Sequence, residues 1–151
     1  MKNLSYFAAA LLLATPVVAD TEIEEVLVSA SLIPIAASRS ANAITIIDGE
    51  QLKNRAALSV SDLLRDVPGL ALSRSGVQGS ATQVRARGSE ANHLLVLIDG
   101  VEANDPSQSD ELNWGILSAD DIERIEVIRG PQSSMRGSDA MAGVVNIVTR
   151  S

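Results

Sequence analysis

Runs of apolar and β-branched residues, separated by short polar turns, make up most of the hydrophobic pattern of the chain. The continuous apolar run Leu94–Ile98 (LLVLI) predicts a strand that is buried on both faces. Residues 83–88 (QVRARG) alternate small apolar with charged side chains and predict a half-buried strand. Strands are also predicted over residues 43–47, 70–73, 125–128 (with Glu126 facing away from the core) and 144–149.

The clearest helical pattern lies over residues 59–67. Ser59 is suited to cap the N-terminus of this helix, with Asp62 three residues on in a variant of the capping box. Single helical turns are predicted over residues 51–55 and 132–136. Together these elements predict a small α+β domain: a mixed β-sheet with short helices and long loops. The apolar face of the helix has the spacing i, i+3, i+4, i+7 and consists of Val60, Leu63, Leu64 and Val67.

Residues 1–19 have the three parts of a secretory signal peptide. Lys2 precedes an apolar run over residues 7–14, and residues 17–19 (VVA) supply a cleavage site before Asp20. The alternative is a buried N-terminal helix. No other stretch approaches the ~18 apolar residues of a transmembrane helix. We therefore expect an exported chain whose mature part begins at Asp20.

Residues 20–40 form a leader ahead of the domain predicted over residues 41–151. The leader holds an acidic cluster that includes Glu22, followed by the β-prone run 26–31 (VLVSAS). A flexible segment that adds a strand to the edge of a partner's sheet has this composition. An ordinary edge strand of the domain fits the composition equally well.

Composition narrows the classes of function. The 151 residues fit one domain, and 12 Lys and Arg against 19 Asp and Glu give a net charge of −7, which argues against nucleic-acid binding. The absence of cysteine excludes disulfides, Cys-based zinc sites and thiol catalysis. Trp114 is the only aromatic residue after the predicted signal peptide, so the chain has neither the stacking platform of a single-strand nucleic-acid binder nor the aromatic girdles of a barrel wall.

Catalytic patterns are weak. The only histidine, His93, precedes a predicted core strand and is interpreted as structural. Calcium binding and a glycosidase-like carboxylate pair were weighed for the acidic loop, but solvated surface charge is favoured. We predict no metal site, no cofactor and no enzymatic activity, with an envelope hydrolase dependent on Asp105 as an alternative. The loop carboxylates are Asp99, Glu102, Asp105, Asp110 and Glu111.

Several motifs in a fixed order resemble the plug domain of TonB-dependent outer-membrane receptors, over about residues 43–150. Residues 92–101 are most similar to the vitamin B12 (cobalamin) branch of that family. The motifs are LLVLIDGV (94–101), IERIEVIRGP (122–131), GSDA (137–140) and GVVNIVT (143–149), preceded by SDLL (61–64), VPG (67–69) and RG (87–88).

The resemblance implies a set of partners and a place in the cell. The plug would sit inside its own 22-stranded barrel in the outer membrane, with Arg and Glu side chains facing the polar barrel wall. If the barrel is truly absent, the chain would be periplasmic. The leader would carry the TonB box, which pairs as a strand with the energising protein TonB in the periplasm. The box residues would be Glu24, Glu25, Val26, Leu27, Val28, Ser29 and Ala30.

The resemblance also implies that the loops 75–83 and 101–114 face outward and contact a small nutrient ligand, of the cobalamin or ferric siderophore class. The positions expected near this ligand are Ala81, Gln83, Glu90, Gln108 and Ser109.

The sequence stops where the first barrel strand of such a receptor would follow. We therefore expect the N-terminal plug portion of a receptor, as a fragment or truncated product, which gates energy-coupled uptake when it is joined to its barrel. A free-standing periplasmic binding module without transport activity is the alternative.

Overall fold

The computed structural model describes residues 27–28, 35–36, 43–55 and 57–150. The predicted signal peptide and the predicted box residues Glu24, Glu25, Val26, Ser29 and Ala30 lie outside these ranges. Within them, no helix combines the length and the apolar composition that crossing a membrane requires.

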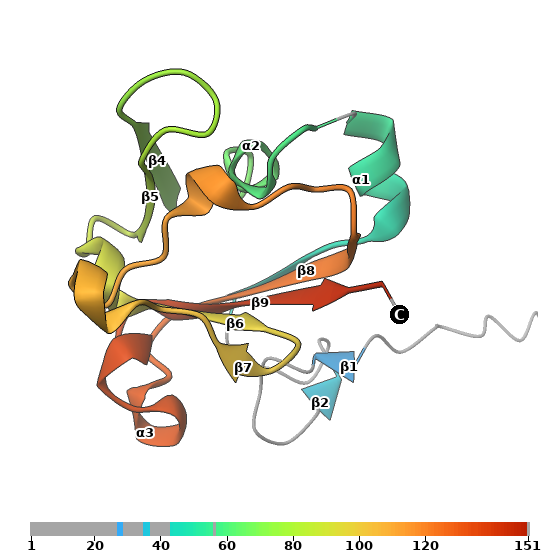
Figure 1. Cartoon of the computed structure of the whole chain (residues 1–151). Helices are drawn as coiled ribbons and strands as arrows, with labels where there is room; N and C mark the ends of the chain where they lie inside the picture. The colour runs from blue at the N-terminus through green and yellow to red at the C-terminus, as the bar shows by residue number, and fades with distance from the viewer. Residues whose placement is uncertain (1–26, 29–34, 37–42, 56, 151) are drawn as a thin grey trace, which may run out of the picture.

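A five-stranded mixed sheet lies at the centre of the fold (Figure 1), with the order β3-β8-β9-β6-β7. β6 and β9 are parallel, and the other neighbours are antiparallel. The predicted mixed sheet of an α+β domain is thereby confirmed. Its strands are β3 (Ala43–Ile47), β6 (Leu94–Ile98), β7 (Val101–Glu102), β8 (Ile122–Arg129) and β9 (Gly143–Thr149).

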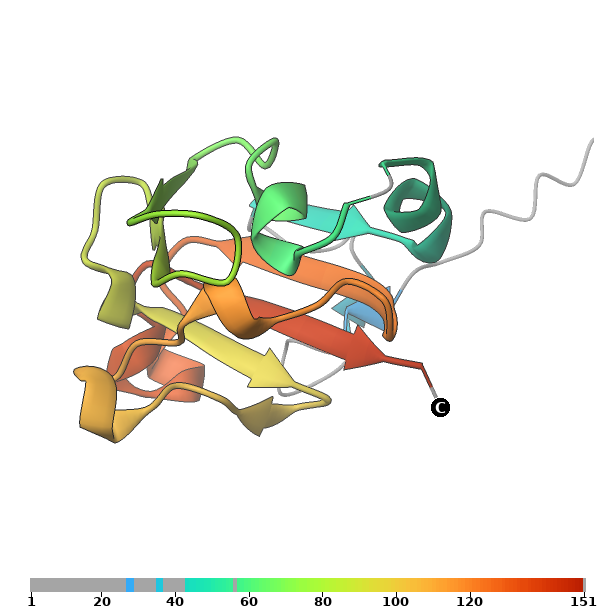
Figure 2. The same ribbon diagram turned by 45° about the horizontal axis from the view of Figure 1, so that its top comes forward.

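Short elements cover both faces of this sheet (Figure 2). One face carries two helices and a β-hairpin, whose antiparallel strands form a separate two-stranded sheet. The other face carries a single helical turn and the 3₁₀ turn that follows it. The first group consists of α1 (Gly49–Arg55), α2 (Val60–Leu64), β4 (Leu70–Arg74) and β5 (Thr82–Ala86), and the second of α3 (Ser133–Arg136) and η5 (Ser138–Ala140).

The central strands β6 and β9 are buried on both sides, which explains their continuous apolar runs. Because successive side chains of a strand point to opposite faces, β6 and β9 must be apolar at nearly every position. Trp114 is 2% exposed and belongs to the larger core, on the side of the helices and the hairpin. The smaller core on the opposite side consists of Leu95, Leu97, Ile128, Ala140 and Val144.

Glu126 corrects one prediction about β8. It points away from Ile125, as the alternation predicts, but it is fully buried rather than facing solvent. Arg124 Nε donates to Glu126 Oε1 at 2.9 Å, and Asn146 Nδ2 donates to Glu126 Oε2 at 3.4 Å. A buried carboxylate requires such partners. The prediction assumed that only one face of the strand is covered, whereas the second face carries the smaller core.

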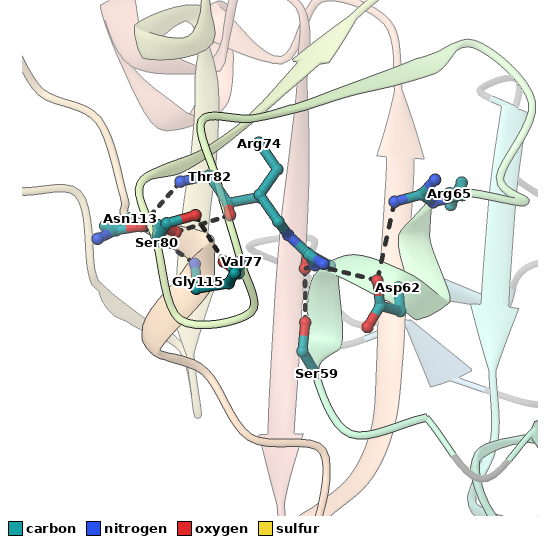
Figure 3. Close-up of polar contacts among 10 residues, drawn as sticks. Ser59, Asp62, Arg65, Arg74, Val77, Ser80, Thr82, Asn113 and Gly115 are labelled. Atoms are coloured by element: carbon teal, nitrogen blue, oxygen red, sulfur yellow. Dashed lines mark hydrogen bonds and ion pairs between the residues drawn. The ribbon is translucent and has the colours of Figure 1, made fainter.

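The capping prediction for the helix at residues 59–67 is confirmed in position and wrong in its contact. Ser59 is the N-cap residue of α2, but its side chain makes no capping hydrogen bond, and the helix is shorter than predicted. Ser59 Oγ lies 2.5 Å from Ser61 Oγ, while Asp62 Oδ1 accepts a hydrogen bond from Arg74 Nη2 at 3.0 Å (Figure 3). The charged donor on β4 competes for the Asp62 carboxylate, because charge-assisted hydrogen bonds are the stronger ones.

The turn after β6 is tied to the end of β9. Asp99 and Gly100 both have positive φ, 50° and 83°, as in the two-residue turns that suit a right-twisted hairpin. The Asp99 carboxylate accepts hydrogen bonds from the backbone N–H of Thr149 at 2.9 Å and from its hydroxyl at 2.6 Å. These hydrogen bonds lower the pKa of Asp99, the one from the Thr149 hydroxyl most.

We expect Gly143→Ala to destabilise the fold, because a Cβ at residue 143 would lie 2.5 Å from the carbonyl oxygen of Ile128 on the paired strand. Gly143 lies in the hydrogen-bonded β8–β9 ladder, where the backbone cannot move aside cheaply, so the predicted loss is about 1–3 kcal/mol in urea unfolding. Gly76→Ala is the control, since there the nearest atoms lie at ordinary contact distance. Equal unfolding midpoints for the two variants would contradict this packing.

Asp99→Asn should lower stability at neutral pH and have little effect in acid. A carboxylate with a depressed folded-state pKa stabilises the fold above its unfolded pKa, near 3.9, and loses that contribution as the pH falls through the folded value. Urea midpoints of the wild type and the variant should therefore differ at pH 7 and converge as the pH falls below the folded-state pKa of Asp99. Asp121→Asn, at an exposed position, controls for the change in net charge. A difference that does not depend on pH would exclude the Asp99 carboxylate as its source.

Candidate functional site

A pocket of about 200 Å³ lies between the β4–β5 hairpin and the loop that leads to the 3₁₀ turn η4 (Trp114–Ile116). The hairpin contributes one wall and the loop the other. The lining residues are Ser73, Ser75, Ala81, Thr82 and Gln83 from the hairpin, and Gln108, Glu111, Leu112 and Asn113 from the loop.

Arg74 fixes the hairpin wall onto α2 (Figure 3). Its Nη2 donates to Ser61 Oγ at 2.9 Å and to Asp62 Oδ1 at 3.0 Å. The Arg74 side chain is 19% exposed, so this ion pair is better shielded from water than a surface pair and holds β4 more firmly.

Asn113 joins the two walls. Its Oδ1 accepts hydrogen bonds from the backbone N–H groups of Thr82 and Gly115, both at 3.1 Å (Figure 3). A Cβ at residue 115 would lie 2.1 Å from the carbonyl oxygen of Ser80, so only glycine permits this close approach. The buried Trp114, between the two, anchors the loop in the larger core.

A short chain of side chains links the two walls of the pocket. Arg85 Nη2 donates to Gln83 Oε1 at 2.7 Å, and Gln83 Nε2 donates to Glu111 Oε2 at 2.5 Å. The amide of Gln83 therefore stands between the cation and the carboxylate and is held in one orientation by both.

The loop wall is shaped by Asp105. Its carboxylate accepts from the backbone N–H of Ser107 and from Gln108 Nε2, both at 2.9 Å. Hydrogen bonds from Ser107 and Gln108 lower the pKa of Asp105, the one from the Ser107 side chain most. Ser109 and Asp110 then adopt left-handed backbone, with φ of 60° and 58°. This turn places Gln108 and Glu111 on the same side of the loop.

The structure brings together three of the five positions expected to face a ligand: Ala81, Gln83 and Gln108. The other two are exposed but lie outside the pocket lining: Glu90 at the start of η2 (Ala91–His93), and Ser109 beside Gln108. Sequence reasoning missed Asn113 and treated Glu111 only as loop charge. The one local sequence signal of the contact between the two walls is an Asn two residues before a Gly, at positions 113 and 115.

In the described part of the chain, His93 and the acidic side chains are not grouped as a catalytic or metal site. His93 is half-buried, and its carbonyl oxygen accepts from the Ala142 N–H at 2.9 Å. In the described part of the chain, no three His, Asp or Glu side chains are grouped so that they could hold a metal ion.

Leu27 and Val28, the described part of the predicted TonB box, form strand β1 (Leu27–Val28). β1 pairs antiparallel with β2 (Ile35–Ala36) in a two-stranded sheet of its own. β1 is therefore not part of the five-stranded sheet.

Comparisons with known proteins identify the family to which this fold belongs. The TonB-dependent Receptor Plug Domain family matches residues 36–144. The vitamin B12 transporter BtuB of Vibrio vulnificus is 39% identical over 107 residues, which cover 71% of this chain and 17% of that protein. The chain thus spans less than a fifth of the length of this curated relative.

Solved structures of receptors agree with this assignment. The siderophore receptor PirA from Acinetobacter baumannii superposes with a TM-score of 0.59 at 30% identity, over 72% of this chain and 17% of that one. The ferric yersiniabactin uptake receptor FyuA from Yersinia pestis gives 0.57 at 26%, over 76% and 18%. Since the family match covers most of the chain and the fold agrees, the chain belongs to the TonB-dependent receptor plug domain family.

Proposed function

We propose that this chain is the gate of a TonB-dependent outer-membrane receptor and controls the energy-coupled uptake of a small nutrient through a surrounding barrel. The observation that carries the proposal is the pocket between the hairpin and the 105–113 loop. It gathers Ala81, Gln83 and Gln108, three of the positions that the resemblance to the family implies near a ligand.

The ligand belongs to the cobalamin or ferric siderophore class. Two kinds of relative support this range: a vitamin B12 transporter and receptors for siderophores. Each of these relatives is a transporter or a receptor by name, which favours a gate over an enzyme or a free-standing module. Residues 1–19 would direct export, and the 22-stranded barrel of such receptors would enclose the plug.

Coupling to TonB would use the segment 24–30. Leu27 and Val28 already have strand conformation, and their described pairing with Ile35–Ala36 involves one edge of β1. TonB would pair with this segment by strand addition, in which backbone hydrogen bonds supply the affinity. Tension on the segment would then reorganise the plug and open a path for the ligand, an order-to-disorder switch.

Leu27→Pro should weaken the binding of the periplasmic domain of TonB to the mature chain (residues 20–151). Proline removes a backbone donor and disrupts strand pairing, so we expect about a tenfold rise in Kd by titration calorimetry. Leu27→Val, which keeps the N–H and the β-propensity, is the control and should bind like the wild type. Equal affinity of the proline variant would exclude strand addition at this segment.

The gating role itself is tested in a chimera. The plug would replace that of the Vibrio vulnificus vitamin B12 transporter, and cells lacking their own transporter would be scored for vitamin B12 uptake. We expect uptake that depends on TonB and is lost with Leu27→Pro. A chimera that reaches the membrane and still takes up vitamin B12 with the proline variant would overturn the proposal.

A further inference from the structure

Hydrogen bonds within the protein use a larger share of the donors of the pocket than of its acceptors. Gln83 Nε2 donates to Glu111, Gln108 Nε2 to Asp105, the Ser75 hydroxyl to the carbonyl oxygen of Ala81, and the Thr82 hydroxyl to that of Ser80. Each of these bonds uses one N–H or O–H of the lining within the protein, and the Gln83 and Gln108 amides each keep a second N–H.

The acceptors are engaged less. Glu111 accepts from Gln83 through Oε2, which leaves the capacity of a second carboxylate oxygen, since an ionised carboxylate has about four lone-pair sites. Gln108 donates one N–H of its amide to Asp105 and keeps its carbonyl oxygen as an acceptor beside a second N–H. Asn113 is the exception: its oxygen is bonded to two backbone N–H groups, and its amide nitrogen is the group it offers.

The charge of the pocket is negative. Of the nine lining residues in the described part of the chain, Glu111 alone carries a formal charge. The neighbouring cation, Arg85, directs its Nη2 at the oxygen of Gln83, so the Gln83 amide separates it from Glu111. An anion entering the pocket would meet a carboxylate at close range in a partly desolvated site, where like charges repel more strongly than in bulk water.

We propose that this pocket selects the hydrogen-bond-donating, uncharged or cationic end of a ligand, such as a primary amide, a hydroxyl or an ammonium group, and rejects carboxylate, phosphate and other anionic ends. Glu111 is the residue that determines this specificity. The inference rests on the proposed function in taking the pocket as ligand-facing, and it deepens that function by naming the chemical class. Because about 200 Å³ is less than the roughly 300–1,000 Å³ of whole small-molecule sites, the pocket receives one end of a larger ligand.

Malonamide and malonate, two small molecules of the same size and different charge, test the proposal on the mature chain. At pH 7 and constant ionic strength, each would be titrated while the backbone amide resonances are followed by NMR. We expect malonamide to shift the resonances of Gln83, Gln108 and Asn113, and to bind at least about tenfold more tightly than malonate, since a like-charge contact costs several kcal/mol.

Glu111→Gln removes the charge but keeps a carbonyl oxygen that can accept from Gln83. In this variant the preference for malonamide should fall to about twofold, with the dispersion of the spectrum reporting an intact fold. Glu102→Gln is the matched control, because Glu102 is exposed in β7 and outside the pocket lining, so the tenfold preference should persist.

Three results would overturn the inference: malonate binding as tightly as malonamide, a preference unchanged by Glu111→Gln, or no shift of the pocket resonances by either compound. These results are independent of the TonB and uptake experiments. Loss of TonB dependence with an intact preference for malonamide would reject the proposed gate while leaving the selectivity of the pocket in place.

Discussion

Strands β8, β9 and β6 are buried on both of their faces, so each face of the sheet must be covered by other elements of the chain. The arrangement of the molecule follows from this requirement. α1, α2 and the β4–β5 hairpin cover one face, and α3 with η5 packs on the other (Figure 1). Because β4 and β5 form a sheet of their own, the hairpin can meet the 105–113 loop, and the pocket forms where they meet.

Burial on both faces also determines where charge can be placed in the sheet. Glu126 and Asn146 face each other across β8 and β9, and Asn146 Oδ1 accepts from the N–H of Gly100 at 3.3 Å. This polar line runs from the β6–β7 turn to Arg124 on β8. Removing one member would take a hydrogen-bond partner from its neighbours within an apolar layer, which costs more than one hydrogen bond contributes.

The strands were predictable because their signal is local. Leu94–Ile98 and residues 144–149 are continuous apolar runs, and the structure has strands at both places. The errors arise from contacts distant in sequence. No local pattern reveals that Arg74 takes the carboxylate of Asp62, or that a second core covers Glu126.

The candidate site was predictable only in part, for the same reason. The resemblance to the family indicated the loops, but which side chains meet depends on Asn113 joining the two walls and on Gly115 lying against Ser80. These contacts link residues about thirty positions apart. Glu90 illustrates the limit of predicting the site from sequence. It was expected to face a ligand, and it is exposed, but the hairpin and the loop form the pocket without it.

The position of β9 has a kinetic consequence. β9 stands between β8 and β6 in the sheet, but it follows both of them in the chain. During synthesis from the N-terminus, β3 can pair with β8 and β6 with β7, but these two half-sheets share no ladder until residues 143–149 arrive. The sheet is therefore completed in a late step that depends on pairing between distant segments, which makes folding slow. Until then β8 and β6 each expose the edge that β9 later covers, and open strand edges of this kind favour aggregation.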